Sequence, residues 1–231
     1  MTFFRGCLLA FFALAAPLLD GYSRTPSAPT AISWARLQTP DPYWNRHQES
    51  DASLIAFMAD SLSTRAEPQL KSVQALRVED LCEFPFLYSQ TIASLSNQES
   101  GNLIEYLRRG GFLFIDACRN RGINPKEDEF LDAQTAILRK GFPDLSVQAL
   151  LTDHAIYTLF YKLEERPPSA NKERRYPLYA LISQKHVIGI IGLNGFQCGW
   201  SRAAITLSDR NVLATASAQM ATNIYLYALS R

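Results

Sequence analysis

The sequence predicts an α/β fold, a flavodoxin-like three-layer sandwich in which a mainly parallel sheet lies between two layers of helices. Residues 83–89 (EFPFLYS) and 111–117 (GFLFIDA) are nearly continuous apolar runs of strand length. Such runs are typical of parallel strands that are buried on both faces. Helical patterns separate the predicted strands, and the connections are long enough for the right-handed crossovers that join parallel strands.

The first elements follow from hydrophobic periodicity. Residues 31–37 alternate between apolar and polar side chains, which predicts a first strand. Asp51 can cap a helix that continues to Thr64 and carries apolar residues at helical spacing. Residues 72–78 predict a second, weaker strand.

The central helices have clear start and stop signals. Ser96 with Glu99 three residues later fits a capping box at the start of a helix, and Gly110 with Gly111 ends it. The next helix is expected over residues 126–140, where a glycine and a proline follow.

The C-terminal part predicts a mixture of strand and short helix over residues 145–161. Two strands over residues 179–183 and 187–193 come next, followed by a loop over residues 194–200. A last, alanine-rich helix is expected over residues 211–229.

The composition is that of one globular domain, expected over residues 31–231. Of the 231 residues, 47% are hydrophobic and 19% are charged, which argues against disorder. The net charge is +1 and no long basic run occurs, so binding of nucleic acid is not expected to be the main function.

The first 30 residues predict a signal peptide, or an N-terminal anchor, followed by a polar tether. Arg5 precedes an apolar run over residues 7–19, which suits a signal sequence and is short for a membrane span. A buried N-terminal helix is the alternative. We therefore expect an exported protein of the periplasm or cell envelope, which touches the membrane only if this segment stays uncleaved.

The cysteine pattern predicts neither a disulfide framework nor a zinc site. After cleavage of a signal peptide, Cys82, Cys118 and Cys198 remain, an odd number without CxxC spacing. One disulfide with one free thiol is possible, and Cys118 with Cys198 is one such pairing. We expect no metal and no cofactor.

Several segments occur in the order and spacing of one known family. They are WARL at 34–37, FPFLYS at 84–89, GGFLFIDAC at 110–118, FPD at 142–144, TDHAIYTLFY at 152–161, NGFQCGW at 194–200 and ATNIYLYAL at 221–229. In these segments the chain resembles the DUF4159 domain family of bacteria. The resemblance implies a fold similar to class I glutamine amidotransferases and a protein that is exported or attached to membrane proteins, without an established activity.

The chain departs from that family's pattern at three places. Gln90 and Thr91 follow a strand where the family has Gly-His, and Asp116-Ala117 stands where the family has two acidic residues. Residues 195–197 replace an Asp-Leu-Gly sequence. The resemblance therefore does not carry over a role that needs the histidine or both carboxylates.

Two groups are candidates for chemistry at the end of the strand that precedes them. Cys118 lies beside Arg119 and Arg121, which could lower its pKa, and His154 could serve as a base. However, Cys118 lacks the glycines of an amidotransferase nucleophile elbow, so an inert thiol is the favoured interpretation. Asp116 could face a ligand or cation, or it could form an ion pair or cap the next turn.

Other polar residues are expected in loops at the same edge of the sheet. Asp153 could orient His154, although a lone histidine beside apolar residues is more often simply packed. The remaining cleft candidates are Trp44, Asn45, Arg46, His47, Asn194, Cys198 and Trp200. Aromatic rings beside amide and guanidinium groups suit carbohydrate or peptide ligands, whereas the alternative for Trp44 is that it only covers the sheet edge.

These observations favour a non-catalytic, exported binding or interaction module. One alternative is a hydrolase or amidase that uses Cys118, or Asp116 with His154. Another is a scaffold component of a cell-envelope complex. The expected partner is a small molecule or an envelope protein.

Overall fold

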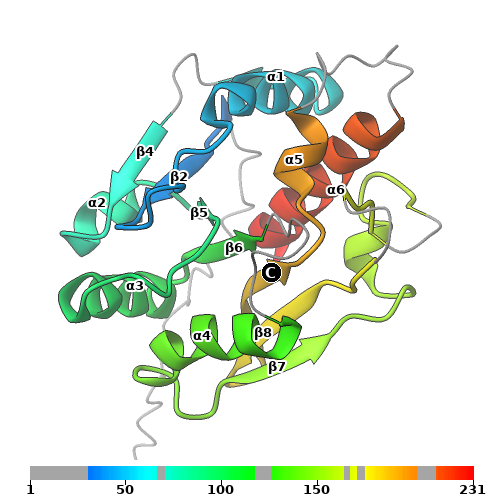
Figure 1. Ribbon diagram of the computed structural model, residues 1–231. Coiled ribbons are helices and arrows are strands. Elements are labelled where there is room, and N and C mark those ends of the chain that lie inside the picture. The colour runs from blue at the N-terminus through cyan, green and yellow to red at the C-terminus, as the bar shows by residue number, and fades with distance from the viewer. Residues whose placement is uncertain (1–30, 67–70, 118–125, 164–166, 171–174, 202–211) are drawn as a thin grey trace, which may run out of the picture.

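A computed structural model describes residues 31–66, 71–117, 126–163, 167–170, 175–201 and 212–231. Within these ranges the fold is α/β, with a mostly parallel mixed sheet covered by helices on both faces (Figure 1). The seven strands of this sheet run in the order β4-β2-β5-β6-β9-β8-β7. Their bounds are Lys71–Gln74 (β4), Ala35–Gln38 (β2), Phe86–Ser89 (β5), Phe112–Asp116 (β6), His186–Gly192 (β9), Tyr179–Ser183 (β8) and Ser146–Ala149 (β7).

The sheet has a parallel part and an antiparallel extension. Neighbouring strands from β4 to β9 pair in parallel, whereas β8 and β7 add in antiparallel orientation. The carboxyl ends of β2, β5, β6 and β9 therefore lie at one edge. From β2 the chain continues to β4 on one side, and from β5 it continues to β6 on the other. The connections after β2 and β5 thus diverge, which is where a crevice forms in open α/β sheets.

The helices form two layers that enclose two hydrophobic cores. Their bounds are Asp51–Ser61 (α1), Val78–Cys82 (α2), Asn97–Arg108 (α3), Glu127–Arg139 (α4), Phe196–Trp200 (α5) and Val212–Ser230 (α6). Helices α1, α5 and α6 cover one face of the sheet, and α2, α3 and α4 cover the other (Figure 1). Two short 3-10 helices, Gln48–Ser50 (η1) and Ala155–Tyr157 (η2), lie in the connections. Within the ranges given above, no helix is long and apolar enough to span a membrane.

Most elements with strong local signals are confirmed. The capping box of α3 forms as expected, with the Ser96 hydroxyl accepting from the Glu99 amide and the Glu99 carboxylate accepting from the Ser96 amide. Gly110 follows the C-cap with a φ of 94°, a left-handed conformation that favours glycine. The strands β5, β6, β8 and β9 and the last helix also lie where the sequence predicts them.

The prediction of one continuous strand over residues 31–37 is wrong, because the segment forms two strands. The chain forms Ala31–Ile32 (β1), which pairs with Arg65–Ala66 (β3), and only then enters β2. Between the two strands, the Ser33 amide donates to the Tyr225 hydroxyl at 3.0 Å and Trp34 packs into the core. These contacts with distant segments interrupt the strand.

Three further element predictions need correction. The strand expected over residues 72–78 ends at Gln74, because the Asn102 amide binds the carbonyls of the next two residues and α2 begins at Val78. Asp51 is not the cap of α1, since Ser50 takes that position and the Asp51 carboxylate binds Arg36. The expected loop over residues 194–200 contains the helix α5. Its N-cap residue Gly195 has a left-handed backbone conformation.

The close contact between β6 and β9 yields a test of the sheet. A Cβ atom added at Gly189 would lie 2.6 Å from the Leu113 carbonyl oxygen of the paired strand, and the backbone cannot move aside cheaply. We expect Gly189→Ala to lower the free energy of unfolding by about 1–3 kcal/mol, as overpacking does. Urea denaturation would measure the change.

Gly101→Ala is the matched control for this test. Gly101 lies inside α3 and nothing would stand within 4 Å of its added Cβ. Alanine there should stabilise the protein by about 0.5–1 kcal/mol, because it favours the helix. Equal effects of the two substitutions would contradict the close strand contact.

Candidate functional site

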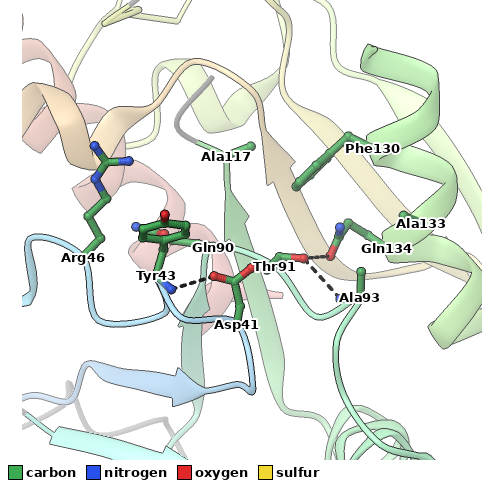
Figure 2. Close-up of a pocket in the computed structure, with 10 residues that line it drawn as sticks. All are labelled: Asp41, Tyr43, Arg46, Gln90, Thr91, Ala93, Ala117, Phe130, Ala133 and Gln134. Atoms are coloured by element: carbon green, nitrogen blue, oxygen red, sulfur yellow. Dashed lines mark hydrogen bonds between the residues drawn. The ribbon is translucent and has the colours of Figure 1, made fainter. Parts of the chain in front are cut away.

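A cavity of about 280 Å³ lies beyond the carboxyl ends of β2 and β5 (Figure 2). The loop after β2, the segment after β5, the end of β6 and one face of α4 form its walls. We call it the β2–β5 pocket, and its lining residues are Asp41, Tyr43, Arg46, Gln90, Thr91, Ala93, Ala117, Phe130, Ala133 and Gln134. It therefore occupies the place where the connections of the sheet diverge.

The Gln134 side chain, although largely buried, presents a hydrogen-bond donor to the pocket. Gln134 is 1% exposed, and its Oε1 accepts from the Ile92 amide at 2.7 Å and from the Thr91 hydroxyl at 3.1 Å. Because a backbone amide can only donate, these contacts fix which end of the side chain carries the NH2 group. Within the described part of the chain, Nε2 has no hydrogen-bond partner, and Figure 2 shows this side chain at the pocket wall. Gln134 Nε2 is not among the fully buried polar atoms without a partner, so water or a ligand in the pocket can reach it.

The loop after β2 supplies charged and aromatic groups at the pocket mouth. The Asp41 carboxylate accepts from the Tyr43 amide at 2.7 Å, which fixes the start of this loop. The Tyr43 side chain is 63% exposed, and the Arg46 guanidinium carbon lies 5.9 Å from its ring centroid. Among the described residues that line the pocket, one carboxylate and one guanidinium therefore balance each other in charge.

Asp116 lies next to the pocket but does not face it. Its carboxylate is fully buried and accepts from the backbone amides of Phe196 at 3.0 Å and Gln197 at 2.8 Å. The Tyr88 hydroxyl, whose one proton also faces Gln197 Oε1 at 3.1 Å, is a third donor at 3.4 Å. Burial raises the pKa of Asp116 from 3.8 to about 6, and the three hydrogen bonds only partly oppose this effect. Asp116 therefore attaches the start of α5 to the end of β6.

Gln197 connects Asp116 with the pocket. Its Oε1 accepts from the Tyr88 hydroxyl at 3.1 Å and from the Gln90 amide group, and its Nε2 donates to the Arg46 carbonyl. Two residues that line the pocket are thus held by one buried side chain of α5. The position of the pocket walls depends on how α5 is attached to the sheet.

A buried ion pair between Arg36 and Asp51 supports the loop that follows β2. Arg36, in β2, binds the Asp51 carboxylate with Nε to Oδ2 at 2.7 Å and Nη2 to Oδ1 at 2.7 Å. Its third nitrogen donates to the Trp44 carbonyl at 3.2 Å, and its guanidinium carbon lies 4.6 Å from the centroid of the Tyr88 ring. Arg36 therefore fixes the loop that carries Tyr43 and Arg46 to both the sheet and α1.

The sequence comparison now identifies the family. Residues 33–229 match the family described as Domain of unknown function (DUF4159), which covers most of the chain. The chain belongs to the DUF4159 family. It shows no significant match to a curated protein sequence.

In this DUF4159 domain, one of the predicted cleft residues in the loop after β2 lines the pocket and the others do not. Arg46 lines the β2–β5 pocket, whereas Trp44 contributes its carbonyl to Arg36. Asn45 and His47 lie in the same loop and do not line the pocket. The His47 ring nitrogen lies 3.6 Å from the Glu49 carboxylate on the surface.

The predicted cleft residues around α5 are part of the core. Trp200 is fully buried, with ring centroids 6.2 Å from Trp34 and 6.0 Å from Tyr88. Asn194 is buried and exchanges hydrogen bonds with the backbone of Tyr176 at 2.8 and 2.9 Å. The DUF4159 domain therefore uses these two residues to hold α5 and the preceding strand in place.

The structure does not bring His154 and Asp116 together. His154 caps η2 by accepting from the Ile156 amide at 3.2 Å, and its ring lies 5.5 Å from that of Tyr227 in the last turns of α6. Burial lowers the pKa of His154, and the exposed Asp153 carboxylate only partly opposes this effect. In the part of the chain that the structure describes, the hydrogen bonds of the Asp116 carboxylate come from Tyr88 and the start of α5.

The cysteine cluster lies partly outside the described residues. Cys118, Arg119 and Arg121 lie outside the described residues, and the predicted pairing of Cys118 with Cys198 therefore lies outside them as well. Cys198, in α5, is disulfide-bonded, whereas Cys82 is an exposed free thiol. Among the described residues, no group of three or more His, Cys, Asp or Glu side chains could hold a metal ion.

A larger cavity of about 560 Å³ lies at the opposite edge of the sheet, but its charged groups are already engaged. Arg108 donates to the Gly141 carbonyl at 2.8 Å, and Asp144 accepts from the Ser183 hydroxyl at 2.7 Å. Arg231 donates to the carbonyls of Gly110 and Gly111 at 3.0 and 2.9 Å. These bonds join structural elements, so the β2–β5 pocket is the better candidate for a ligand.

Three glutamines of the site, Gln90, Gln134 and Gln197, were not among the predicted site residues. They come from three separate segments, and glutamine at a single position carries no recognisable motif. Arg36 was also missed, although it is a lone charge inside an apolar strand. A charge in such a place requires a buried partner, so this residue could have been found.

Proposed function

We propose that this DUF4159 protein is an exported, non-catalytic binding module that holds a small ligand in the β2–β5 pocket. The observation that carries the proposal is the buried Gln134 amide, whose NH2 group lies at the pocket wall without a partner among the described residues. A ligand acceptor would satisfy this donor at little cost, because the side chain is already fixed by Ile92 and Thr91.

Strand order supports a flavodoxin-like or amidotransferase-like fold with a ligand at this place. The parallel strands β4-β2-β5-β6-β9 have the order 2-1-3-4-5 when numbered along the chain. In folds with this order the ligand binds beyond the carboxyl ends of the strands numbered 1 and 3. These are β2 and β5, whose ends form the pocket.

The surroundings of Asp116 and His154 favour binding over acid–base catalysis by these two residues. The Asp116 carboxylate is turned into the backbone of α5, and His154 packs against Tyr227. A general acid and a general base must both reach the same substrate. Because Asp116 contacts α5 and His154 contacts Tyr227, these two side chains do not face a common substrate position.

Two features support export to the periplasm or cell envelope. The apolar run at residues 7–19 after Arg5 suits a signal sequence. Cys198 is disulfide-bonded, and disulfides persist mainly in oxidising compartments.

A thermal-shift screen of the purified full chain would test the binding function. The screen would use sugars, amino acids and dipeptides, and we expect at least one class to raise the melting temperature. A ligand at one hundred times its Kd adds about 2.7 kcal/mol of stability. Tyr43→Ala should remove the shift, because Tyr43 is exposed at the pocket mouth, whereas the control Phe160→Ala should keep it.

Two results would contradict the proposal. One is the absence of any shift that depends on Tyr43. The other is turnover of amide, ester or glycoside substrates that disappears in Cys118→Ala or Asp116→Ala, which would show an enzyme.

A further inference from the structure

We propose that the β2–β5 pocket binds one ring of a neutral carbohydrate. This inference rests on the proposed binding function and names its ligand class. A free sugar and the terminal unit of a saccharide chain both present such a ring, with the same hydroxyl groups, to the pocket.

The balance of charge in the pocket favours a ligand without net charge. Among the lining residues that the structure describes, Asp41 and Arg46 are the charged ones, and they carry opposite signs. A phosphate or a dicarboxylate would meet the Asp41 carboxylate as well as Arg46. An anionic ligand of that kind needs an excess of positive charge, as in clusters of arginine.

The hydrogen-bonding groups in the pocket match hydroxyl groups. The Gln134 amide and the Arg46 guanidinium are donors, whereas the Asp41 carboxylate and the Gln90 carbonyl oxygen are acceptors. A hydroxyl can both donate and accept, so neighbouring hydroxyls of one ring can satisfy donors and acceptors that stand side by side. A site with a buried polar group discriminates strongly against ligands that leave that group unpaired.

The pocket also has apolar surfaces of the kind that sugar rings contact. Figure 2 shows Tyr43 and Phe130 on opposite sides of the pocket, with the methyl groups of Ala93, Ala117 and Ala133 along its walls. Tyr43 is mostly exposed, so its ring is accessible to a ligand. Aromatic rings bury apolar area while polar groups around them fix orientation, which suits the C–H faces of a sugar.

The size of the pocket suits a single ring. Its volume of about 280 Å³ is just below the range of roughly 300–1,000 Å³ that is typical of pockets for drug-sized ligands. Tyr43 and Arg46 are exposed at its mouth, so a longer saccharide could extend from the bound ring into solvent.

Titration of the ¹⁵N-labelled full chain followed by NMR would test the ligand class. The probes are glucose, galactose, mannose and N-acetylglucosamine as free sugars, their linear oligosaccharides, glycine and alanine as zwitterionic competitors, and inorganic phosphate as an anionic competitor. We expect at least one sugar to shift the Gln134 and Gln90 side-chain amide signals, and the zwitterionic and anionic probes to leave them unchanged. If an oligosaccharide binds more tightly than its monosaccharide, the natural ligand is a chain end. Equal affinities of the two would identify a free sugar.

Variants would connect the binding to the pocket. Tyr43→Ala should weaken sugar binding by about tenfold or more, as loss of an aromatic contact does. Gln134→Glu keeps an acceptor for the Ile92 amide but removes the NH2 donor, and it should weaken binding similarly. Phe160→Ala and Gln148→Glu, at exposed positions that do not line the pocket, are the matched controls and should bind normally.

The outcomes separate this inference from the proposed function. If an amino acid binds at Tyr43 and Gln134 while no sugar does, the carbohydrate inference is wrong and the binding function stands. If sugars bind equally well to both pocket variants, the site lies elsewhere and the inference is wrong. If none of the probes binds and the wider screen is also negative, both proposals fail.

Discussion

Substitution of either partner of the Arg36–Asp51 ion pair is expected to lower the free energy of unfolding by about 3–5 kcal/mol. The side chains of Arg36 and Asp51 are 0% and 3% exposed, so Arg36→Met or Asp51→Leu leaves one buried charge without its counter-ion. The double variant Arg36→Met/Asp51→Leu should recover most of this loss, because two apolar side chains need no partner. Urea denaturation of the three variants would measure these changes.

An exposed ion pair serves as the control for this prediction. Arg109 and Glu105 also lie 2.9 Å apart, but their side chains are 50% and 41% exposed. Arg109→Met should cost less than about 1 kcal/mol, since water solvates the remaining charge. If Arg36→Met costs no more than Arg109→Met, the Arg36–Asp51 pair is not buried as described.

The second large effect concerns the pH dependence of stability at Asp116. The pKa of this carboxyl is about 6 in the folded protein, above its ordinary value of 3.8. Between these values the folded state binds more protons than the unfolded state, so the contribution of Asp116 to stability falls as the pH rises. The cost of ionisation is complete above the folded pKa and amounts to roughly 3 kcal/mol.

Comparison with Asp116→Asn isolates this contribution. Asparagine does not titrate, so the difference in unfolding free energy between wild type and variant should change in favour of the wild type as the pH falls from about 7 to about 4. Other carboxylates affect both proteins equally and cancel in the difference. Parallel stability curves over this range would show that the folded pKa of Asp116 is not raised.

The sequence predicted those parts of the fold that depend on local signals. The apolar runs at β5 and β6, the capping box at Ser96 and the stop at Gly110 each need only a few neighbouring residues. The break between β1 and β2 depends instead on Tyr225, which is 192 positions from Ser33 in the chain. Contacts of that range cannot be read from periodicity.

The candidate site was predicted in place but not in its residues. The sequence indicated the carboxyl edge of the sheet, and the β2–β5 pocket, which Arg46 lines, lies at that edge. It also placed Asp116 correctly at the end of β6, yet α5, which was not predicted, occupies the carboxylate with its backbone amides. Asp116 is therefore turned away from the pocket by an element that the sequence did not predict.

The role of Gln197 has a consequence for the chemical ageing of the protein. Conversion of its amide to an acid would replace one nitrogen by oxygen and leave the shape almost unchanged. The Arg46 carbonyl would lose its donor, and a second acidic group would enter the buried surroundings of Asp116. Deamidation at this single position could thus impair the pocket although Gln197 does not belong to its lining.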